Sequence, residues 1–127
     1  MNVTVAATQM SCGWDRDENI AKAERLVREA AGRGANVVLI QELFETPYFC
    51  KDHLASHFEL ARELGENPAV RRLAEVAAEL GVVLPLSIFE RAQNAYFNTL
   101  VMVDADGSTN SCFTPSILMA VSSRSPL

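Results

Sequence analysis

Lysine is scarce in this sequence, acidic residues outnumber basic ones by 16 to 11, and long apolar runs are missing. Among 127 residues there are two lysines, Lys22 and Lys51, and the formal net charge is −5, which disfavours an anionic partner such as nucleic acid or a membrane surface. Apolar runs reach only a few residues, and the N-terminus lacks the basic start and apolar core of a signal peptide. We therefore expect a cytoplasmic protein that binds neither nucleic acid nor a membrane.

Cysteine and histidine are too few to define a disulfide framework or a metal site. The three cysteines have no CxxC spacing, so free thiols are expected. His53 and His57 lie four residues apart, which would place both on one face of a helix, and Asp52 or Glu59 offers a third zinc ligand. The HExxH pattern is absent, however, and two surface histidines are the preferred interpretation. We expect no metal site.

The composition fits one soluble α/β domain, or part of one. Hydrophobic residues make up 49% of the chain and charged residues 21%, and a chain of this length buries roughly two thirds of its unfolded surface. Apolar periodicity predicts strands at 3–10, 37–40, 82–89 and 95–103, and helices at 18–34, 54–64 and 68–80. The first strand, helix and second strand form a βαβ unit. The last two strands form a hairpin.

The strand at 37–40 leads to the first candidate for chemistry. Its four apolar residues predict burial on both faces, and Glu42 follows at its C-terminal end, where open α/β sheets usually bind ligands. Tyr48 and Phe49 belong to an irregular aromatic segment that we interpret as a pocket wall, because Pro47 prevents a run-on into helix. On the pattern alone, Glu42 is more often a turn or capping carboxylate.

Three segments give the chain a family resemblance. Residues 3–10, 36–49 and 81–92 resemble the carbon-nitrogen hydrolase (nitrilase) superfamily, and the longer match, which includes Cys50, is similar to its N-carbamoylputrescine amidase branch. The resemblance extends over 1–107. It implies an α/β fold, the N-terminal portion of the nitrilase-type α-β-β-α four-layer sandwich, in which two sheets are flanked by helices.

The resemblance also implies a chemistry. The superfamily uses a Glu-Lys-Cys triad: the glutamate is the general base, the lysine supports the developing oxyanion, and the cysteine attacks the substrate carbon. Glu42 falls on the glutamate. No lysine follows Lys51, and the positions of the family's lysine and cysteine lie beyond the matching part, so we expect this chain to be inactive alone.

The N-carbamoylputrescine amidase branch hydrolyses N-carbamoylputrescine to putrescine, CO2 and NH3 in polyamine biosynthesis. The resemblance implies a small carbamoyl amine as substrate, no metal or organic cofactor, and a homo-oligomer for the full-length protein. Two alternatives stay open. In the first, the chain is a non-catalytic interaction subunit or truncated isoform that associates with the full-length enzyme. In the second, it belongs to another omega-amidase or nitrilase-like carbon-nitrogen hydrolase.

Five residues receive predicted roles at the site. A general base needs a pKa raised toward neutrality, so we expect Glu42 to be partly buried among neighbouring aromatic side chains, where desolvation would raise its pKa. Tyr48 and Phe49 are expected to contact substrate. Glu90 and Asn98 match family positions, and we expect them to orient the backbone and the groups around the site.

Other residues are weaker candidates. Cys50 lies eight positions after Glu42 and beside Lys51, which makes it a rival nucleophile, but a packed cysteine is the preferred interpretation. Lys51 lies on the wrong element to replace the family's lysine. Cys112 is interpreted as a chance cysteine, and Trp14 either covers the pocket mouth or simply packs.

The composition changes after Gly107. Six serines occur in the last twenty residues against three in all those before, and no acidic residue follows Asp106. In the family, this turn leads to a strand and then to a basic segment that supplies the lysine. We therefore divide the chain into 1–107, an incomplete carbon-nitrogen hydrolase domain, and 108–127, a divergent Ser/Thr-rich tail from alternative splicing, a retained intron or a frame shift. A natural Ser/Thr-rich tail is the alternative.

Overall fold

The computed structural model describes residues 1–49, 55–93 and 95–114. Within them the order of elements is β1 (Val5–Ala7), α1 (Arg16–Gly32), β2 (Val37–Leu39), the 3-10 helices η2 (Ala55–Leu60) and η3 (Leu64–Glu66), α2 (Pro68–Leu80), β3 (Leu84–Ala92), β4 (Ala95–Val103) and β5 (Thr109–Thr114). None of the helices in this part of the chain has the length and apolar character needed to cross a bilayer.

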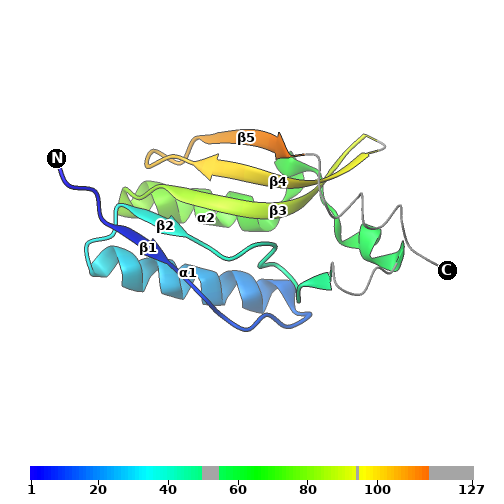
Figure 1. Ribbon diagram of the computed structural model, residues 1–127, viewed down its shortest axis with the longest axis horizontal. Coiled ribbons are helices and arrows are strands. Elements are labelled where there is room, and N and C mark those ends of the chain that lie inside the picture. The colour runs from blue at the N-terminus through cyan, green and yellow to red at the C-terminus, as the bar shows by residue number, and fades with distance from the viewer. Residues whose placement is uncertain (50–54, 94, 115–127) are drawn as a thin grey trace.

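The strands form two sheets, β1-β2 and β3-β4-β5, which an isolated parallel bridge joins side by side so that the strands follow one another in chain order (Figure 1). β1 and β2 are parallel, and β3, β4 and β5 are antiparallel. The two parts join where Val37 bridges Val83: the Val38 N–H donates to the Val83 carbonyl at 3.0 Å, and the Val83 N–H donates to the Asn36 carbonyl at 2.9 Å. The predicted βαβ unit and the predicted hairpin are confirmed.

Local signals explain why α2 begins and ends where the sequence predicts. The Asn67 side chain accepts from the backbone N–H groups of Ala69 and Val70, at 2.8 and 3.1 Å, and Pro68 follows in the first helical position. Gly81, at φ 67°, ends the helix in the left-handed conformation that glycine adopts without strain. The predicted range 68–80 is therefore confirmed.

Both helices pack on one face of the sheet, and the main core lies between them. Alternate residues in the first part of β3 and the last part of β4 point into this core and are fully buried: Leu84, Leu86, Ile88, Val101 and Val103. The helices contribute residues spaced three and four apart, which are Ile20, Ala23, Val27, Leu73, Val76 and Ala77. In Figure 1 α2 lies behind β3, so the viewer looks onto the opposite face of the sheet.

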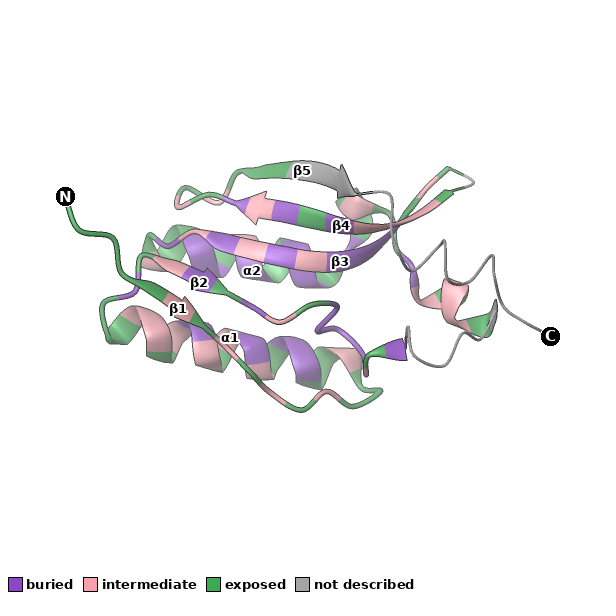
Figure 2. Cartoon of the chain, in the orientation of Figure 1, coloured by how far each residue is buried: buried purple, intermediate pink, exposed green. Residues whose placement is uncertain are grey.

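That opposite face, here called the open face, carries apolar side chains in contact with solvent. Its apolar side chains are Val5, Val37, Leu39, Val83, Leu100 and Met102, and strand register places the polar Ser87, Asn98 and Asn110 on the same face. Val5 is 71% exposed, Leu39 49% and Leu100 38%, and Figure 2 shows the exposed stretches of β1 and β4. The predicted burial of the strand at 37–40 on both faces is therefore wrong: one face packs on the helices and the other does not.

The predicted helix at 54–64 is confirmed only in its first part, and as a 3-10 helix. Residue 54 lies outside the described residues, and residues 55–60 form a 3-10 helix. Arg62 is extended instead, because its backbone pairs with β3: the Arg62 N–H donates to the Phe89 carbonyl at 3.2 Å, and the Arg91 N–H donates to the Arg62 carbonyl at 2.9 Å. Pairing with the sheet has overridden the helical pattern.

The sheet continues into the segment that the sequence assigns to a tail. The Asp104 N–H donates to the Ser108 carbonyl at 2.8 Å, Gly107 turns the chain at φ 86°, and β5 then pairs with β4. A domain boundary at Gly107 stays a prediction, and residues 115–127 lie outside the described residues.

Candidate functional site

Glu42 lies just past the end of β2, at the margin of the open face, where it meets a polar chain of hydrogen bonds. The Asn98 Nδ2 donates to Glu42 Oε1 at 2.5 Å, and the Ser87 hydroxyl donates to Asn98 Oδ1 at 2.9 Å. The Leu43 backbone N–H in turn donates to Ser87 Oγ at 3.2 Å. Side chains from the loop after β2, from β3 and from β4 therefore meet at one place.

The direction of these hydrogen bonds fixes the orientation of the Asn98 amide. The Glu42 carboxylate can only accept, so the Asn98 oxygen is the end that faces Ser87; the Ser87 hydroxyl donates to it and its oxygen accepts from the Leu43 N–H. The amide nitrogen of Asn98 is then the end that faces Glu42. The Glu42 carboxylate therefore accepts from the Asn98 NH2 group, and the bonds among Asn98, Ser87 and Leu43 hold that amide in place.

The backbone beside Glu42 adopts an uncommon conformation. Leu43 has φ 50°, in the left-handed region that non-glycine residues seldom occupy. Its side chain is buried in a small second core with Phe49, Ala61 and Phe89, and its N–H is the group held by Ser87. Strained backbone of this kind costs on the order of 1 kcal/mol and is found most often at functional sites, which fits the placement of Glu42.

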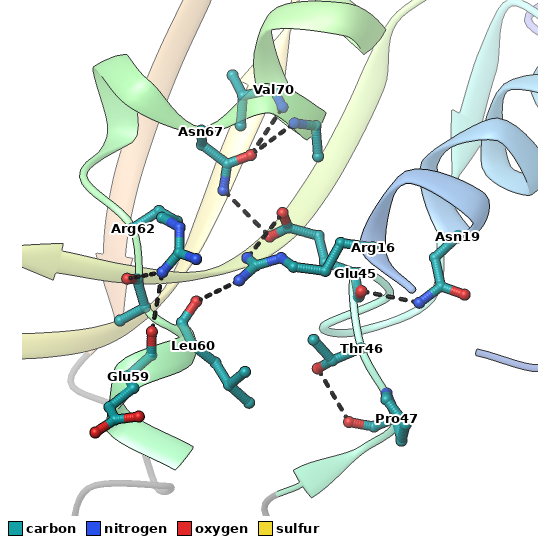
Figure 3. A network of polar contacts seen from close by, with 12 residues as sticks. Arg16, Asn19, Glu45, Thr46, Pro47, Glu59, Leu60, Arg62, Asn67 and Val70 are labelled. Atoms are coloured by element: carbon teal, nitrogen blue, oxygen red, sulfur yellow. Dashed lines mark hydrogen bonds and ion pairs between the residues drawn. The ribbon is translucent and has the colours of Figure 1, made fainter. Parts of the chain in front are cut away.

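Glu45 anchors the loop that carries Glu42, as Figure 3 shows. Its side chain is buried at 5% exposure, and its Oε1 lies 3.1 Å from Arg16 while its Oε2 accepts from Asn67 at 3.1 Å. The Glu45 carbonyl accepts from Asn19 at 2.9 Å, and Arg16 also donates to the Leu60 carbonyl at 2.9 Å. The loop is thereby tied to the N-termini of both helices.

Sequence reasoning did not identify Glu45. A glutamate beside Phe44 and before Thr46 in a largely apolar segment was a signal of burial, and a buried carboxylate needs a cationic or donor partner. Its partners lie 29 and 22 residues away in the chain, so nothing local in the sequence pointed to Arg16 or Asn67.

Two expectations about the surroundings of Glu42 are wrong: its partial burial and its enclosure by aromatic side chains. Glu42 is exposed rather than partly buried, because it lies on the side of the sheet that the helices do not cover. Phe44 points into the main core at 0% exposure, and Tyr48 is 49% exposed, so the predicted aromatic enclosure is not present. Phe49 is buried against Phe89, with ring centroids 5.0 Å apart, and the cavity beside it measures about 10 Å³.

Of the two residues expected to orient the site, the structure brings one to Glu42. Asn98 contacts it directly. Glu90 follows Ile88 by two residues in β3, so its side chain points to the same side of the sheet, toward the helices. There it is 5% exposed and accepts from the Thr99 hydroxyl at 2.6 Å. Its position supports the sheet rather than the site.

The other candidate groups give little chemistry in the described part of the chain. Cys50, Lys51 and His53 lie outside the described residues, as does the side chain of Cys112. Burial raises the pKa of the Cys12 thiol, which disfavours the nucleophilic thiolate. The described residues contain no group of three or more His, Cys, Asp or Glu side chains that could hold a metal ion.

Comparison with known proteins defines the class. The family model "Carbon-nitrogen hydrolase" matches residues 4–121, and the chain belongs to this family. The predicted fold class is confirmed as well: a carbon-nitrogen hydrolase from Helicobacter pylori G27 superimposes with a TM-score of 0.80 at 26% identity, covering 91% of this chain and 40% of that one.

Two curated relatives place the chain within the family. It is 46% identical over 106 residues to "N-carbamoylputrescine amidase" of Arabidopsis thaliana, covering 84% of this chain and 36% of the relative. It is 41% identical over 107 residues to "Citrullinase" of Francisella tularensis, covering 84% of this chain and 37% of the relative. The chain therefore spans just over a third of the length of the curated relatives it matches.

Proposed function

We propose that this chain supplies the general-base part of a carbon-nitrogen hydrolase site, with Glu42 as the base. The observation that carries the proposal is the hydrogen bond from Asn98 to Glu42 at the margin of the open face. It holds a carboxylate at the end of β2 on the side of the sheet that the two helices leave uncovered, where further layers of a longer protein would meet it.

The proposed substrate of the whole protein is an N-carbamoyl amine, with N-carbamoylputrescine as the first choice. Identities of 46–49% to relatives named "N-carbamoylputrescine amidase" support this choice. The reaction would yield putrescine, CO2 and ammonia, a step of polyamine biosynthesis. The proposed cytoplasmic location and homo-oligomeric state rest on the sequence and the resemblance alone.

The proposed chemistry needs Glu42 together with a cysteine and a lysine from the rest of a longer enzyme. A cysteine thiolate would attack the ureido carbon, and a lysine would stabilise the developing oxyanion. Glu42 would take the proton of the attacking thiol and return it to the leaving nitrogen, so that collapse of the tetrahedral intermediate breaks the C–N bond, releases putrescine and leaves a carbamoyl thioester. Glu42 then takes a proton from water, and the attack of that water on the thioester carbon frees the thiol and carbamic acid, which breaks down to CO2 and ammonia.

A chimera tests the proposal. Residues 1–107 of this chain replace the matching segment of the Arabidopsis thaliana enzyme, and ammonia release from N-carbamoylputrescine is measured. We expect turnover by the chimera and a loss of at least about 100-fold with Glu42→Gln, in line with the usual contribution of a general base. Glu29→Gln, an exposed glutamate of α1, is the matched control. Equal activity of the two variants would refute the role of Glu42.

The second candidate function is that of a non-catalytic subunit that associates with a full-length enzyme. The exposed apolar side chains of the open face favour it, because surfaces of this kind commonly mark interaction sites. Co-expression of the tagged chain with the full-length amidase tests it. Recovery of both proteins in a fixed ratio is expected, and a tagged chain recovered without the enzyme would exclude this function.

A further inference from the structure

We propose that Ser87 is a positioning residue of the site, which holds Glu42 in place through a closed ring of hydrogen bonds. The inference rests on the function proposed for Glu42 and adds a residue that acts through its neighbours. It is supported by the contacts of the Ser87 hydroxyl, by the backbone conformation beside Glu42, and by the register of β3 and β4.

The Ser87 hydroxyl reaches Glu42 by two routes. It donates to Asn98 Oδ1 at 2.9 Å, and the Asn98 amide nitrogen donates to the Glu42 carboxylate. It also accepts from the Leu43 N–H at 3.2 Å, and Leu43 directly follows Glu42 in the chain. The two routes close a ring of four residues. All four belong to the described chain, so the ring does not depend on what covers the open face in a longer protein.

The position of Ser87 requires a group that donates and accepts at once. The ring presents a carbonyl oxygen from Asn98 and an N–H from Leu43, and a serine hydroxyl offers one donor and two acceptor sites. The register of the sheet places this hydroxyl: Phe89 pairs with Asn98, so Ser87, two residues earlier, is a diagonal neighbour of Asn98 on the same face. An alanine here would supply neither bond.

The backbone beside Glu42 is one object of this positioning. Leu43 has φ 50°, a conformation that costs a non-glycine residue free energy, and the bond from its N–H to Ser87 contributes stabilisation of similar size. The Leu43 side chain is 3% exposed in the second core, so removing the hydroxyl should shift the turn without unfolding it. Because Leu43 follows Glu42 directly, the carboxylate would shift with the turn.

The Glu42 side chain is the other object. Glu42 is exposed, and an unrestrained glutamate side chain has several rotamers. The bond from Asn98 selects one of them, provided that the NH2 group of Asn98 faces the carboxylate. Ser87 donates to the opposite end of that amide and so favours this orientation over the flipped one, in which two oxygens would face each other.

The test uses the chimera described above with the variants Ser87→Ala, Ser87→Thr and Thr99→Val. A displacement of about 1 Å can cost about 100-fold in rate. Because Asn98 remains in Ser87→Ala, we expect a smaller fall in kcat of about 10-fold, with KM changed less than about twofold. Ser87→Thr keeps the hydroxyl and should recover most of this loss. Thr99→Val is the matched control, because the Thr99 hydroxyl points to the helix side, where it donates to Glu90, and its kcat should equal that of the unaltered chimera.

A double variant separates this inference from the function proposed for Glu42. If Ser87 acts through Glu42, Ser87→Ala should cost less than about twofold in the Glu42→Gln background, so that the two losses are not additive. Full activity of Glu42→Gln would refute the proposed function itself. A large loss in Glu42→Gln with an unchanged kcat in Ser87→Ala would refute the role of Ser87 alone, as would additive losses or a failure of Ser87→Thr to recover activity.

Amide hydrogen exchange of the full chain gives a second measurement, which needs no turnover and serves even if the Ser87→Ala chimera does not fold. The Leu43 N–H should exchange about 10-fold faster or more in Ser87→Ala than in the unaltered chain, because its acceptor is removed. Ser87→Thr and Thr99→Val should keep the protection of this amide. Equal exchange of the Leu43 N–H in Ser87→Ala and the unaltered chain would overturn the proposal.

Discussion

Replacing Glu45 by alanine should destabilise the protein far more than replacing a surface glutamate. The Glu45 side chain is 5% exposed and that of Arg16 is 18% exposed, so the change leaves a largely buried guanidinium without its carboxylate. Breaking a fully buried ion pair costs about 3–5 kcal/mol. Because Arg16 keeps some access to water and its bond to the Leu60 carbonyl, we expect a loss of about 2–3 kcal/mol in the free energy of unfolding.

Urea denaturation followed by circular dichroism measures this loss, and Glu29→Ala is the matched control. Glu29 pairs with Arg33 on the surface, with side chains 57% and 79% exposed, so its removal should cost about 0.5 kcal/mol or less. The double variant Arg16→Ala/Glu45→Ala should show a coupling energy of about 1–3 kcal/mol. If Glu45→Ala is no more damaging than Glu29→Ala, the loop is not anchored by this ion pair and the reasoning fails.

Three further predictions concern pH, a turn and turnover. A hydrogen bond from Arg72 lowers the pKa of Glu24 below its ordinary value of 4.5. The Glu24 carboxylate therefore stabilises the fold above pH 4.5, and this contribution is lost as the pH falls through the lowered pKa. Glu24→Gln should weaken the dependence of the unfolding midpoint on pH in acid, and an unchanged dependence would contradict the assignment. Gly107→Ala should cost about 1–3 kcal/mol in a thermal or urea melt, because φ is 86° and the new Cβ would lie 3.1 Å from the Ala74 carbonyl oxygen; a stability equal to the unaltered protein would count against it. The purified chain alone should release no more ammonia from N-carbamoylputrescine than its Glu42→Ala variant, and any excess would show that it needs no other part of the enzyme.

Elements with strong local signals could be predicted from the sequence. Asn67, Pro68 and Gly81 define both ends of α2 through caps made within a few residues. The strand at 95–103 was predicted with its observed bounds, because apolar alternation and the turn at Asp104 delimit it. The contact between Asn98 and Glu42 was not predicted: the family resemblance gave Asn98 only a role in orienting the groups around the site, and 56 residues separate the two in the chain.

The failures share one physical cause, which is contact with residues distant in sequence. Arg62 pairs with β3, and this pairing ends a helix that the apolar spacing predicts. Four consecutive apolar residues at 37–40 indicate burial without saying what covers each face, and Leu39 is exposed because the described residues place helices on one side alone. The same reason leaves Glu42 in contact with solvent.

The fixed orientation of the Asn98 amide has a consequence for how the site can be probed. A glutamine at position 42 can keep the bond from Asn98 only by presenting its carbonyl oxygen, since two NH2 groups cannot pair. Its own nitrogen must then take the place of the outer carboxylate oxygen. This single exchange therefore preserves the shape of the side chain while turning the outward atom from a proton acceptor into a donor.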